Sequence, residues 1–227
     1  MTAATTPVVI DRTNLKEFIA RRVAKELRDG DFVNLGIGLP TLVPQFLAPE
    51  VQVTLQAEVG MVGAGPCPAV EPDPRYVVDA GGKPASIRLG GAFIDSVTSF
   101  TLIRGGHVDA TVLGALQVDA EGNLANWIIP GKMVPGMGGA MDLVVGAKRV
   151  IVAMEHTQRG EPKILPRCTL PLTAVKCVDL IVTEMGVIEV RPTGLVLTEI
   201  NPEFTVAQVV AATAAVLTVS PNLVEIR

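Results

Sequence analysis

The chain has few of the residues on which most metal sites and acid–base centres depend. Its 227 residues include only two histidines, His107 and His156, and three cysteines, Cys67, Cys168 and Cys177. Neither histidine has a second ligand at metal-binding spacing, so we expect no metal site and two hydrogen-bonded structural histidines. An odd number of cysteines without paired metal-binding spacing favours reduced, buried thiols and a cytoplasmic location.

Several other signals are also absent. Glycines, prolines and charges interrupt every apolar stretch before it reaches membrane-spanning length, and the first residues lack the pattern of a signal peptide. The net charge is −4 and no stretch is basic, so we expect neither a membrane nor a nucleic-acid partner. Neither a Gly-x-Ser-x-Gly elbow nor a Gly-Lys-Ser/Thr phosphate loop occurs. An enzyme of this composition must work without histidine chemistry.

The order of the expected elements indicates an α/β fold. Asn14 and Glu17 have capping-box spacing, and an apolar stripe continues from Leu15 to Leu27 before Gly30 ends the helix. A strand over 32–35, a helix over 41–47 and a strand over 51–58 follow, which favours a parallel sheet with crossover helices in one domain, 1–227. Further strands are expected at 86–89, 110–117, 149–154, 180–183 and 194–197, and a capped helix from Thr205 to about residue 217.

Glu58 is the first candidate catalytic residue. It ends the β-branched run 51–58 and is followed by three glycines, Gly60, Gly63 and Gly65. A carboxylate at the carboxyl end of a strand lies where open α/β proteins bind ligands. It is already ionised at neutral pH and can therefore act as a nucleophile without a base. The alternative is a solvated glutamate in a tight turn.

Two glycine loops accompany it. Gly36 and Gly38 follow a strand, but Thr41 occupies the third position of the dinucleotide fingerprint, which makes an NAD site a weak interpretation. The second loop precedes an apolar segment and contains Gly136, Gly138 and Gly139. Such a loop can direct backbone N–H groups at an oxyanion, or it can be a simple surface turn. One glutamate, several glycine loops and a near absence of histidine together suit an acyl-CoA thioester as the electrophile.

Several strings, in one order along nearly the whole chain, resemble the β subunit of the family I CoA-transferases that act on 3-oxoacids. These strings are Asn34-Leu-Gly-Ile-Gly-Leu-Pro40, Leu55-Gln-Ala-Glu-Val-Gly60, Ile103-Arg-Gly-Gly-His-Val-Asp109, Asn123-Leu-Ala-Asn-Trp127, Pro130-Gly-Lys-Met133, Gly136-Met-Gly-Gly-Ala-Met-Asp-Leu143, Cys168-Thr-Leu-Pro-Leu-Thr173 and Ile181-Val-Thr-Glu184. The resemblance implies an open, mostly parallel sheet flanked by helices, which is the isomerase-like CoA-transferase fold.

The resemblance also implies roles for single residues. Glu58 matches the family's nucleophile, which becomes a glutamyl-CoA thioester in a ping-pong reaction, and Asn34 matches an active-site asparagine. The residues expected to bind substrate or CoA, or to form the oxyanion site, are Asn34, Gly36, Gly38, Gly60, Lys83, Gly136, Gly138 and Gly139. Ala57 and Val59 depart from the family, which has Ser and Asn on either side of the glutamate.

The resemblance implies a partner and substrates as well. A homologous α subunit is expected to complete an α2β2 assembly, with an acyl-CoA and a carboxylic acid as substrates. Acetoacetate, 3-oxoadipate and short fatty acids all fit, in ketone-body or short-chain fatty acid metabolism. Coenzyme A is a substrate, and no permanently bound cofactor is expected. Two alternatives stay open: a sugar-phosphate isomerase-like enzyme with Glu58 as base, and a non-catalytic acyl-CoA-binding subunit.

Overall fold

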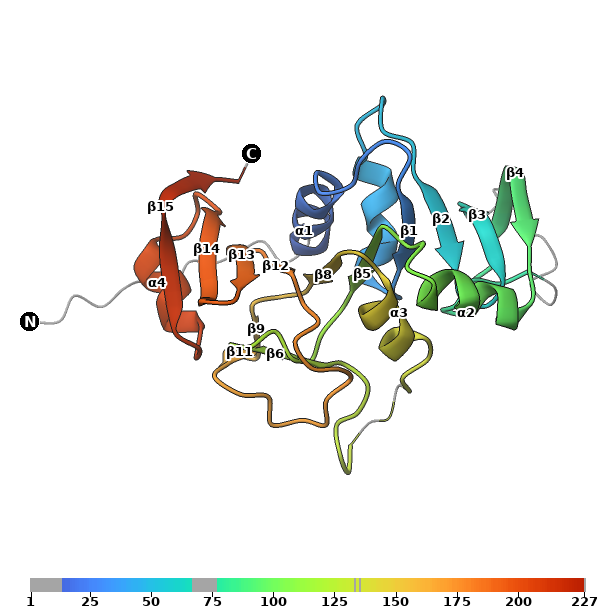
Figure 1. Cartoon of the computed structure of the whole chain (residues 1–227). Helices are drawn as coiled ribbons and strands as arrows, with labels where there is room; N and C mark the ends of the chain where they lie inside the picture. Colours follow the sequence, from blue (N-terminus) through green and yellow to red (C-terminus); the bar gives the residue numbers. More distant parts are fainter. Residues whose placement is uncertain (1–13, 67–76, 133, 135, 227) are drawn as a thin grey trace, which may run out of the picture.

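A ten-stranded sheet organises the computed structural model, which describes residues 14–66, 77–132, 134 and 136–226. The sheet crosses the molecule from β15 to β4 in the order β15-β14-β13-β12-β8-β5-β1-β2-β3-β4 (Figure 1). Its strands are β1 (Phe32–Leu35), β2 (Thr54–Ala57), β3 (Met61–Gly65), β4 (Ser86–Phe93), β5 (Ala110–Leu113), β8 (Val150–Ala153), β12 (Leu180–Val182), β13 (Gly186–Arg191), β14 (Gly194–Ile200) and β15 (Leu217–Glu225).

The centre of the sheet is parallel, and antiparallel pairs flank it. Strands β2, β1, β5, β8 and β12 pair in parallel. Antiparallel pairs join β2 to β3 and β3 to β4 on one side, and β12 to β13 and β13 to β14 on the other, where the outermost strand β15 pairs in parallel with β14. The central strands are covered on both faces and are therefore almost wholly apolar. The prediction of an open, mostly parallel α/β sheet flanked by helices is confirmed.

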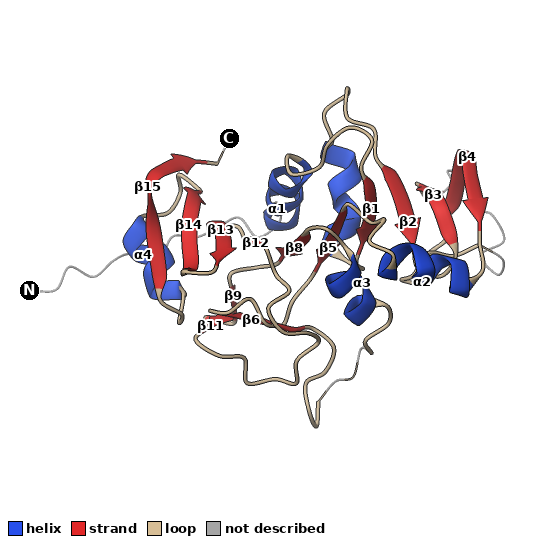
Figure 2. Cartoon of the chain, in the orientation of Figure 1, coloured by secondary structure: helices blue, strands red, loops and turns tan. Residues whose placement is uncertain are grey.

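Helices cover the two faces of the sheet (Figure 2). The helix α1 (Leu15–Ala24) and the 3-10 helix η1 (Leu39–Phe46) pack on one face, where Ile19 and Val23 meet Val33 and Val112. On the other face, α2 (Ser96–Arg104) and α3 (Ala140–Gly146) pack against each other. The helix α4 (Val206–Ala212) lies between β14 and β15 in the chain. A three-stranded sheet contains β11 (Ile164–Leu165), β6 (Gln117–Asp119) and β7 (Leu124–Ala125), and a two-stranded sheet contains β9 (Thr157–Gln158) and β10 (Glu161–Pro162).

Several predicted boundaries are wrong, for local reasons. The first helix ends at Ala24, and the Asn14 side chain makes no capping hydrogen bond. The segment predicted as a helix over 41–47 is 3-10 helical, because Pro44 in its interior lacks an N–H group. The strand expected over 51–58 is only β2, and that over 110–117 divides into β5 and the start of β6. The capping box of Thr205 and Gln208 is confirmed, although α4 ends at Ala212 and the chain returns as β15.

The two histidines differ. His156 is fully buried, with Nδ1 3.0 Å from Thr183 Oγ1 and Nε2 2.8 Å from Thr213 Oγ1, as predicted for a structural histidine. The ring of His107 is exposed and has no hydrogen bond within the described part of the chain. The prediction for His107 is therefore wrong, because the turn after α2 leaves its ring at the surface.

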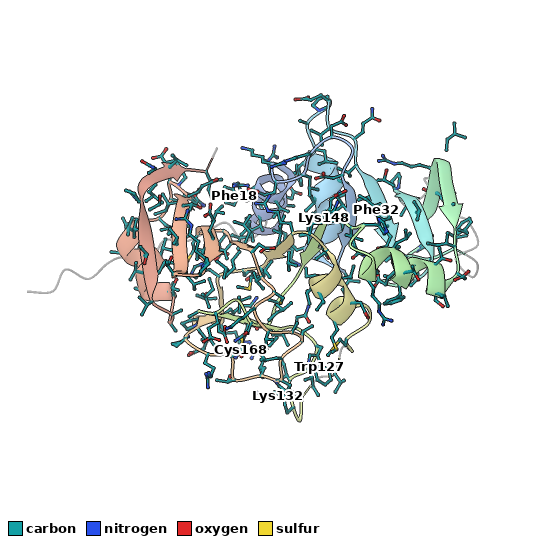
Figure 3. The ribbon with its side chains drawn as sticks, in the orientation of Figure 1. Phe18, Phe32, Trp127, Lys132, Lys148 and Cys168 are labelled. Atoms are coloured by element: carbon teal, nitrogen blue, oxygen red, sulfur yellow. The ribbon has the colours of Figure 1, made fainter. Side chains whose placement is uncertain are left out.

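The cysteines in the described residues are free thiols. Cys168 and Cys177 are partly buried, and burial raises the pKa of Cys168 to about 12 and that of Cys177 to about 11. Cys168 lies beside β6 and β11 (Figure 3), with its Sγ 3.6 Å from the carbonyl oxygen of Asn123. These are unreactive thiols at neutral pH. Cys67 lies outside the described residues.

The described residues include neither a membrane-spanning helix nor a cluster of metal-binding side chains. Within residues 14–66, 77–132, 134 and 136–226, no helix is long and apolar enough to cross a bilayer. Over the same residues, no group of three or more His, Cys, Asp or Glu side chains could hold a metal ion. The expectation of a single domain over 1–227 extends beyond the described residues and stays a prediction.

Candidate active site

Glu58 lies at the carboxyl edge of the parallel sheet. Strands β1 and β2 pair in parallel with Asn34 opposite Gln56, so both strands end on the same side. Glu58 is the first residue after β2, and its side chain is half-buried. The sheet topology therefore presents this carboxylate at a strand end, as the sequence predicted.

The turn after Glu58 requires glycine. The Gly60 N–H group donates to the Ala57 carbonyl oxygen over 3.0 Å, and the Ile94 N–H group donates to the Gly60 carbonyl oxygen over 2.9 Å. Gly60 has a φ of +123°, and a Cβ atom built there would lie 2.3 Å from the Ile94 oxygen. Any other residue would push the turn away from β4, and Glu58 with it.

Asn34 reaches Glu58 directly. Its side chain is 1 % exposed, and its Nδ2 atom lies 3.2 Å from Glu58 Oε2. The residues are distant enough in sequence that only the pairing of β1 with β2 brings them together. An amide N–H group beside a carboxylate can hold its orientation and can donate to an oxygen that forms on the same carbon.

Gly139 brings the second glycine loop against the same carboxylate. A Cβ atom at Gly139 would lie 3.1 Å from Glu58 Cγ and 3.4 Å from Phe100 Cζ. The start of α3 therefore lies so close to the Glu58 side chain and to the Phe100 ring on α2 that there is little room for a side chain at position 139. Gly136 and Gly138 have φ values of +89° and +52°, which suit glycine in a turning loop, and a Cβ atom built at either position would meet nothing within 4 Å.

Among the described residues, no hydrogen bond or ion pair joins Gly36, Gly38 or Lys83 to Glu58. A Cβ atom at Gly36 would lie 3.0 Å from Leu113 Cδ2, so Gly36 permits close packing beyond β1, and Gly38 has a φ of +81° where η1 begins. Lys83 lines a cavity of about 410 Å³ together with Gln56 and Ala57 of β2. The structure therefore brings Lys83 to the neighbouring cavity and not into contact with the carboxylate.

Two buried polar residues near Glu58, Gln56 and Ser99, were not predicted from the sequence as site residues. Gln56 is 3 % exposed and accepts from Asn34 Nδ2 over 2.7 Å, while Ser99 on α2 is fully buried and accepts from Gln56 Nε2 over 2.8 Å. The alternation of Thr54, Gln56 and Glu58 along β2 could have indicated Gln56, since every second residue of a strand shares a face. No local pattern indicates Ser99.

The two residues that depart from the family pattern have different surroundings. Ala57 is buried with Met61 and Ala85, where a small apolar residue packs well. Val59 is 55 % exposed beside Glu58. The substitution at Val59 therefore changes an accessible surface next to the carboxylate, and that at Ala57 changes the interior.

Comparison with known proteins identifies the family. The family model described as coenzyme A transferase matches residues 16–212. The chain belongs to the coenzyme A transferase family. It is 55 % identical over 209 residues to the acetate CoA-transferase subunit beta of Escherichia coli K12, covering 92 % of this chain and 95 % of that protein. It is 48 % identical over 208 residues to a mitochondrial succinyl-CoA:3-ketoacid coenzyme A transferase 2B of Mus musculus, covering 90 % of this chain and 40 % of the mouse protein.

Solved structures agree on the fold. The acyl-CoA transferase YdiF of Escherichia coli O157:H7 matches with a TM-score of 0.76 and 21 % identity, over 100 % of this chain and 45 % of that one. Glutaconate coenzyme A-transferase from Acidaminococcus fermentans matches with a TM-score of 0.67 and 20 % identity, over 93 % and 88 %. The decarboxylase AibA/AibB also matches, with a TM-score of 0.65 and 22 % identity over 92 % and 87 %, so the fold alone does not decide the reaction.

The family membership confirms the resemblance derived from the sequence motifs, including the assignment as a CoA-transferase β subunit. The class of reaction, transfer of coenzyme A between an acyl-CoA and an acid, follows from that membership. It also decides against the sugar-phosphate isomerase-like alternative. The CoA-transferase fold is confirmed in the same way.

Proposed function

We propose that this chain carries the nucleophile of a CoA transfer between an acyl-CoA and a short-chain or 3-oxo acid, with Glu58 as the residue that becomes covalently modified. The observation that carries the proposal is the position of Glu58. It is a half-buried carboxylate at the end of β2, 3.2 Å from Asn34 Nδ2 and close to Gly139, where a Cβ atom would lie 3.1 Å from Glu58 Cγ. A positioned nucleophile beside amide donors is what acyl transfer requires.

The reaction proceeds in two halves. A Glu58 carboxylate oxygen attacks the thioester carbonyl carbon, the C–S bond breaks, and CoA thiolate leaves behind a mixed anhydride. The thiolate then attacks the Glu58 carbonyl carbon and expels the donor acid as a carboxylate, which forms the glutamyl-CoA thioester. The acceptor carboxylate repeats these steps in reverse and regenerates Glu58. No proton is gained or lost overall, so the lack of histidine in the site is no obstacle.

Each tetrahedral intermediate bears an oxyanion that needs donors. Asn34 Nδ2 is already within hydrogen-bonding distance of Glu58 Oε2. When the thiolate attacks the Glu58 carbonyl carbon, Asn34 can donate to the oxyanion that forms on that carbon. The wall formed by Gly139 and Phe100 limits the rotamers of the Glu58 side chain. The expected contributions of Gly36, Gly38, Gly60, Gly136 and Gly138 are to shape the surrounding loops. Lys83 lies at the cavity beside β2, where a cationic side chain suits the anionic parts of CoA.

An α-subunit partner is part of this proposal. Large apolar side chains are exposed on the elements that surround Glu58: Val59 in its turn, Val97 on α2, and Met141 and Val145 on α3, with exposed fractions of 51–79 %. Apolar groups gathered around a functional site indicate a surface that another protein covers. The relatives named as β subunits support the same interpretation, and α2β2 is the assembly we propose.

The substrates proposed are an acyl-CoA and a carboxylic acid of small size, with coenzyme A as a substrate rather than a resident cofactor. The names of the relatives include acetate and 3-ketoacid transferases. Exposed Val59, where the family has Asn, favours a less polar acyl group than acetoacetate at that side of the site.

Trapping the thioester tests the mechanism. The chain and its α subunit are incubated with acetyl-CoA or acetoacetyl-CoA without an acceptor, and the peptide containing Glu58 is analysed by mass spectrometry. We expect one CoA adduct on Glu58 and inactivation by borohydride, which reduces the thioester. An active complex without any adduct on Glu58 would exclude this mechanism.

Shortening the side chain tests its geometry. Glu58→Asp withdraws the carboxylate by one methylene from Asn34 and should lower kcat roughly a hundredfold, because covalent catalysis tolerates a displacement of about 1 Å poorly. Glu50→Asp is the matched control, since Glu50 is an exposed carboxylate in the loop before β2. If Glu58→Asp kept the wild-type kcat, Glu58 would not be the nucleophile, and the alternative of a non-catalytic, acyl-CoA-binding subunit would be favoured.

A further inference from the structure

A chain of buried amides connects Glu58 to helix α2. Asn34 Nδ2 lies 3.2 Å from Glu58 Oε2 and 2.7 Å from Gln56 Oε1, and Gln56 Nε2 lies 2.8 Å from Ser99 Oγ. The side chains of Asn34, Gln56 and Ser99 are 1 %, 3 % and 0 % exposed. Water therefore does not compete for these groups, and each hydrogen bond constrains the next.

Only one orientation of the two amides gives every contact a donor and an acceptor. The Glu58 carboxylate can only accept, so Asn34 must present its NH₂ group. Gln56 must then present Oε1 to Asn34, and its own NH₂ group is left pointing at Ser99, whose hydroxyl oxygen accepts. If both amides were reversed, Asn34 Oδ1 would face the carboxylate.

The environment of Asn34 shows what this orientation costs. Its Oδ1 atom is buried and has no hydrogen-bond partner among the residues that the structure describes, while three oxygens surround Nδ2: Gln56 O, Gln56 Oε1 and Glu58 Oε2. The NH₂ group has only two hydrogens for these three oxygens, so the oxygens compete for them. The position of Gln56 Oε1, the nearest of the three at 2.7 Å, therefore affects where the two N–H groups point and how well one of them is directed at Glu58.

We infer that Ser99 and Gln56 are positioning residues, which hold the Asn34 amide with its N–H groups toward Glu58 and toward the oxyanion that forms there. This inference rests on the proposed function of Glu58. Neither residue touches the carboxylate, so both act through Asn34. When Ser99 loses its hydroxyl, Gln56 Nε2 loses the acceptor that fixes the Gln56 amide, and Gln56 Oε1 is no longer held in place beside the Asn34 N–H groups.

The test is the rate of thioester formation on Glu58 in the complex with the α subunit. Ser99→Ala should lower this rate and kcat about tenfold while leaving KM within about twofold, which corresponds to about 1.4 kcal/mol of transition-state stabilisation. Alanine is the best helix former, so α2 should remain intact. Gln56→Met, which removes both ends of the contact, should lower kcat at least as much. Ser99→Thr, which keeps the hydroxyl, should restore most of the rate.

A double-mutant cycle shows whether the effect passes through Asn34. In the Asn34→Ala background, Ser99→Ala should change the rate by less than about twofold, because the group that it positions is gone. A loss in that background as large as in the wild type would overturn the inference. Thr213→Val is the control, since it deletes a buried hydroxyl bonded to His156 at the other end of the sheet and should leave kcat unchanged.

A failure of the proposed function can be distinguished from a failure of the role inferred for Ser99 and Gln56. If an active wild-type complex forms no adduct on Glu58, the mechanism fails, and the orientation of Asn34 is then read from its side-chain amide signals by NMR. These signals should shift in Ser99→Ala and not in Thr213→Val. Unchanged Asn34 signals in Ser99→Ala would overturn the role of Ser99 whatever the reaction is.

Discussion

Burial of His156 makes the stability of the fold depend on pH. The ring is fully buried between the hydroxyls of Thr183 and Thr213, and burial, with a smaller effect of the nearby Lys163 cation, lowers its pKa from 6.5 to about 4. The unfolded chain therefore binds a proton at a higher pH than the folded chain does. This contribution to stability is complete above pH 6.5 and is lost as the pH falls toward 4.

The size of the effect follows from the two pKa values. A difference of about 2.5 units corresponds to about 3 kcal/mol when the folded-state histidine is finally protonated, and about 2 kcal/mol of this is already lost at pH 5. Glu184 acts in the opposite direction, since burial raises its pKa and so favours the folded state at lower pH. Only a comparison with a variant that lacks the imidazole therefore isolates the contribution of His156.

The measurement is urea unfolding of the full chain, followed by circular dichroism between pH 7.5 and 5. Between pH 7.5 and 5, the free energy of unfolding of His156→Gln should fall by about 2 kcal/mol less than that of the wild type. The comparison uses the change with pH, so it does not depend on the stability of the variant at pH 7.5. His107→Gln, at an exposed ring, should have the wild-type slope. Equal slopes for the wild type and His156→Gln would refute the assignment of a buried, neutral imidazole.

Two further predictions concern the surroundings of Glu58. Gly139→Ala places a Cβ atom 3.1 Å from Glu58 Cγ, so kcat should fall about tenfold with little change in unfolding temperature; unchanged kcat would show that the Glu58 side chain is not confined there. Val59→Asn should alter the ratio of kcat/KM for acetoacetate to that for a medium-chain acid several-fold, because one hydrogen bond is worth about 1 kcal/mol. Equal kcat/KM values in parallel assays would make this departure from the family neutral.

The sequence predicted the position of Glu58, the proposed nucleophile, from local features. A β-branched strand, a carboxylate at its end and glycines directly after it place Glu58 at the edge of the sheet. The structural role of His156 and the capping box at Thr205 were also predicted from local sequence. In the structure His156 is buried and hydrogen-bonded, and the capping box is present. The ends of the helices were less predictable. Pro44 lies inside η1, which is 3-10 helical, and the chain after α4 forms β15 because it pairs with β14.

The surroundings of Glu58 could not be read in the same way. Asn34, Gln56 and Ser99 are separated by 22 and 43 residues, and Gly139 comes from another loop altogether. Parallel pairing of β1 with β2, and the packing of α2 and α3 on that face, bring them together. A strand end can be recognised from its own residues. The hydrogen bonds that orient a carboxylate depend on which distant segments pack beside it, and that is a property of the folded chain.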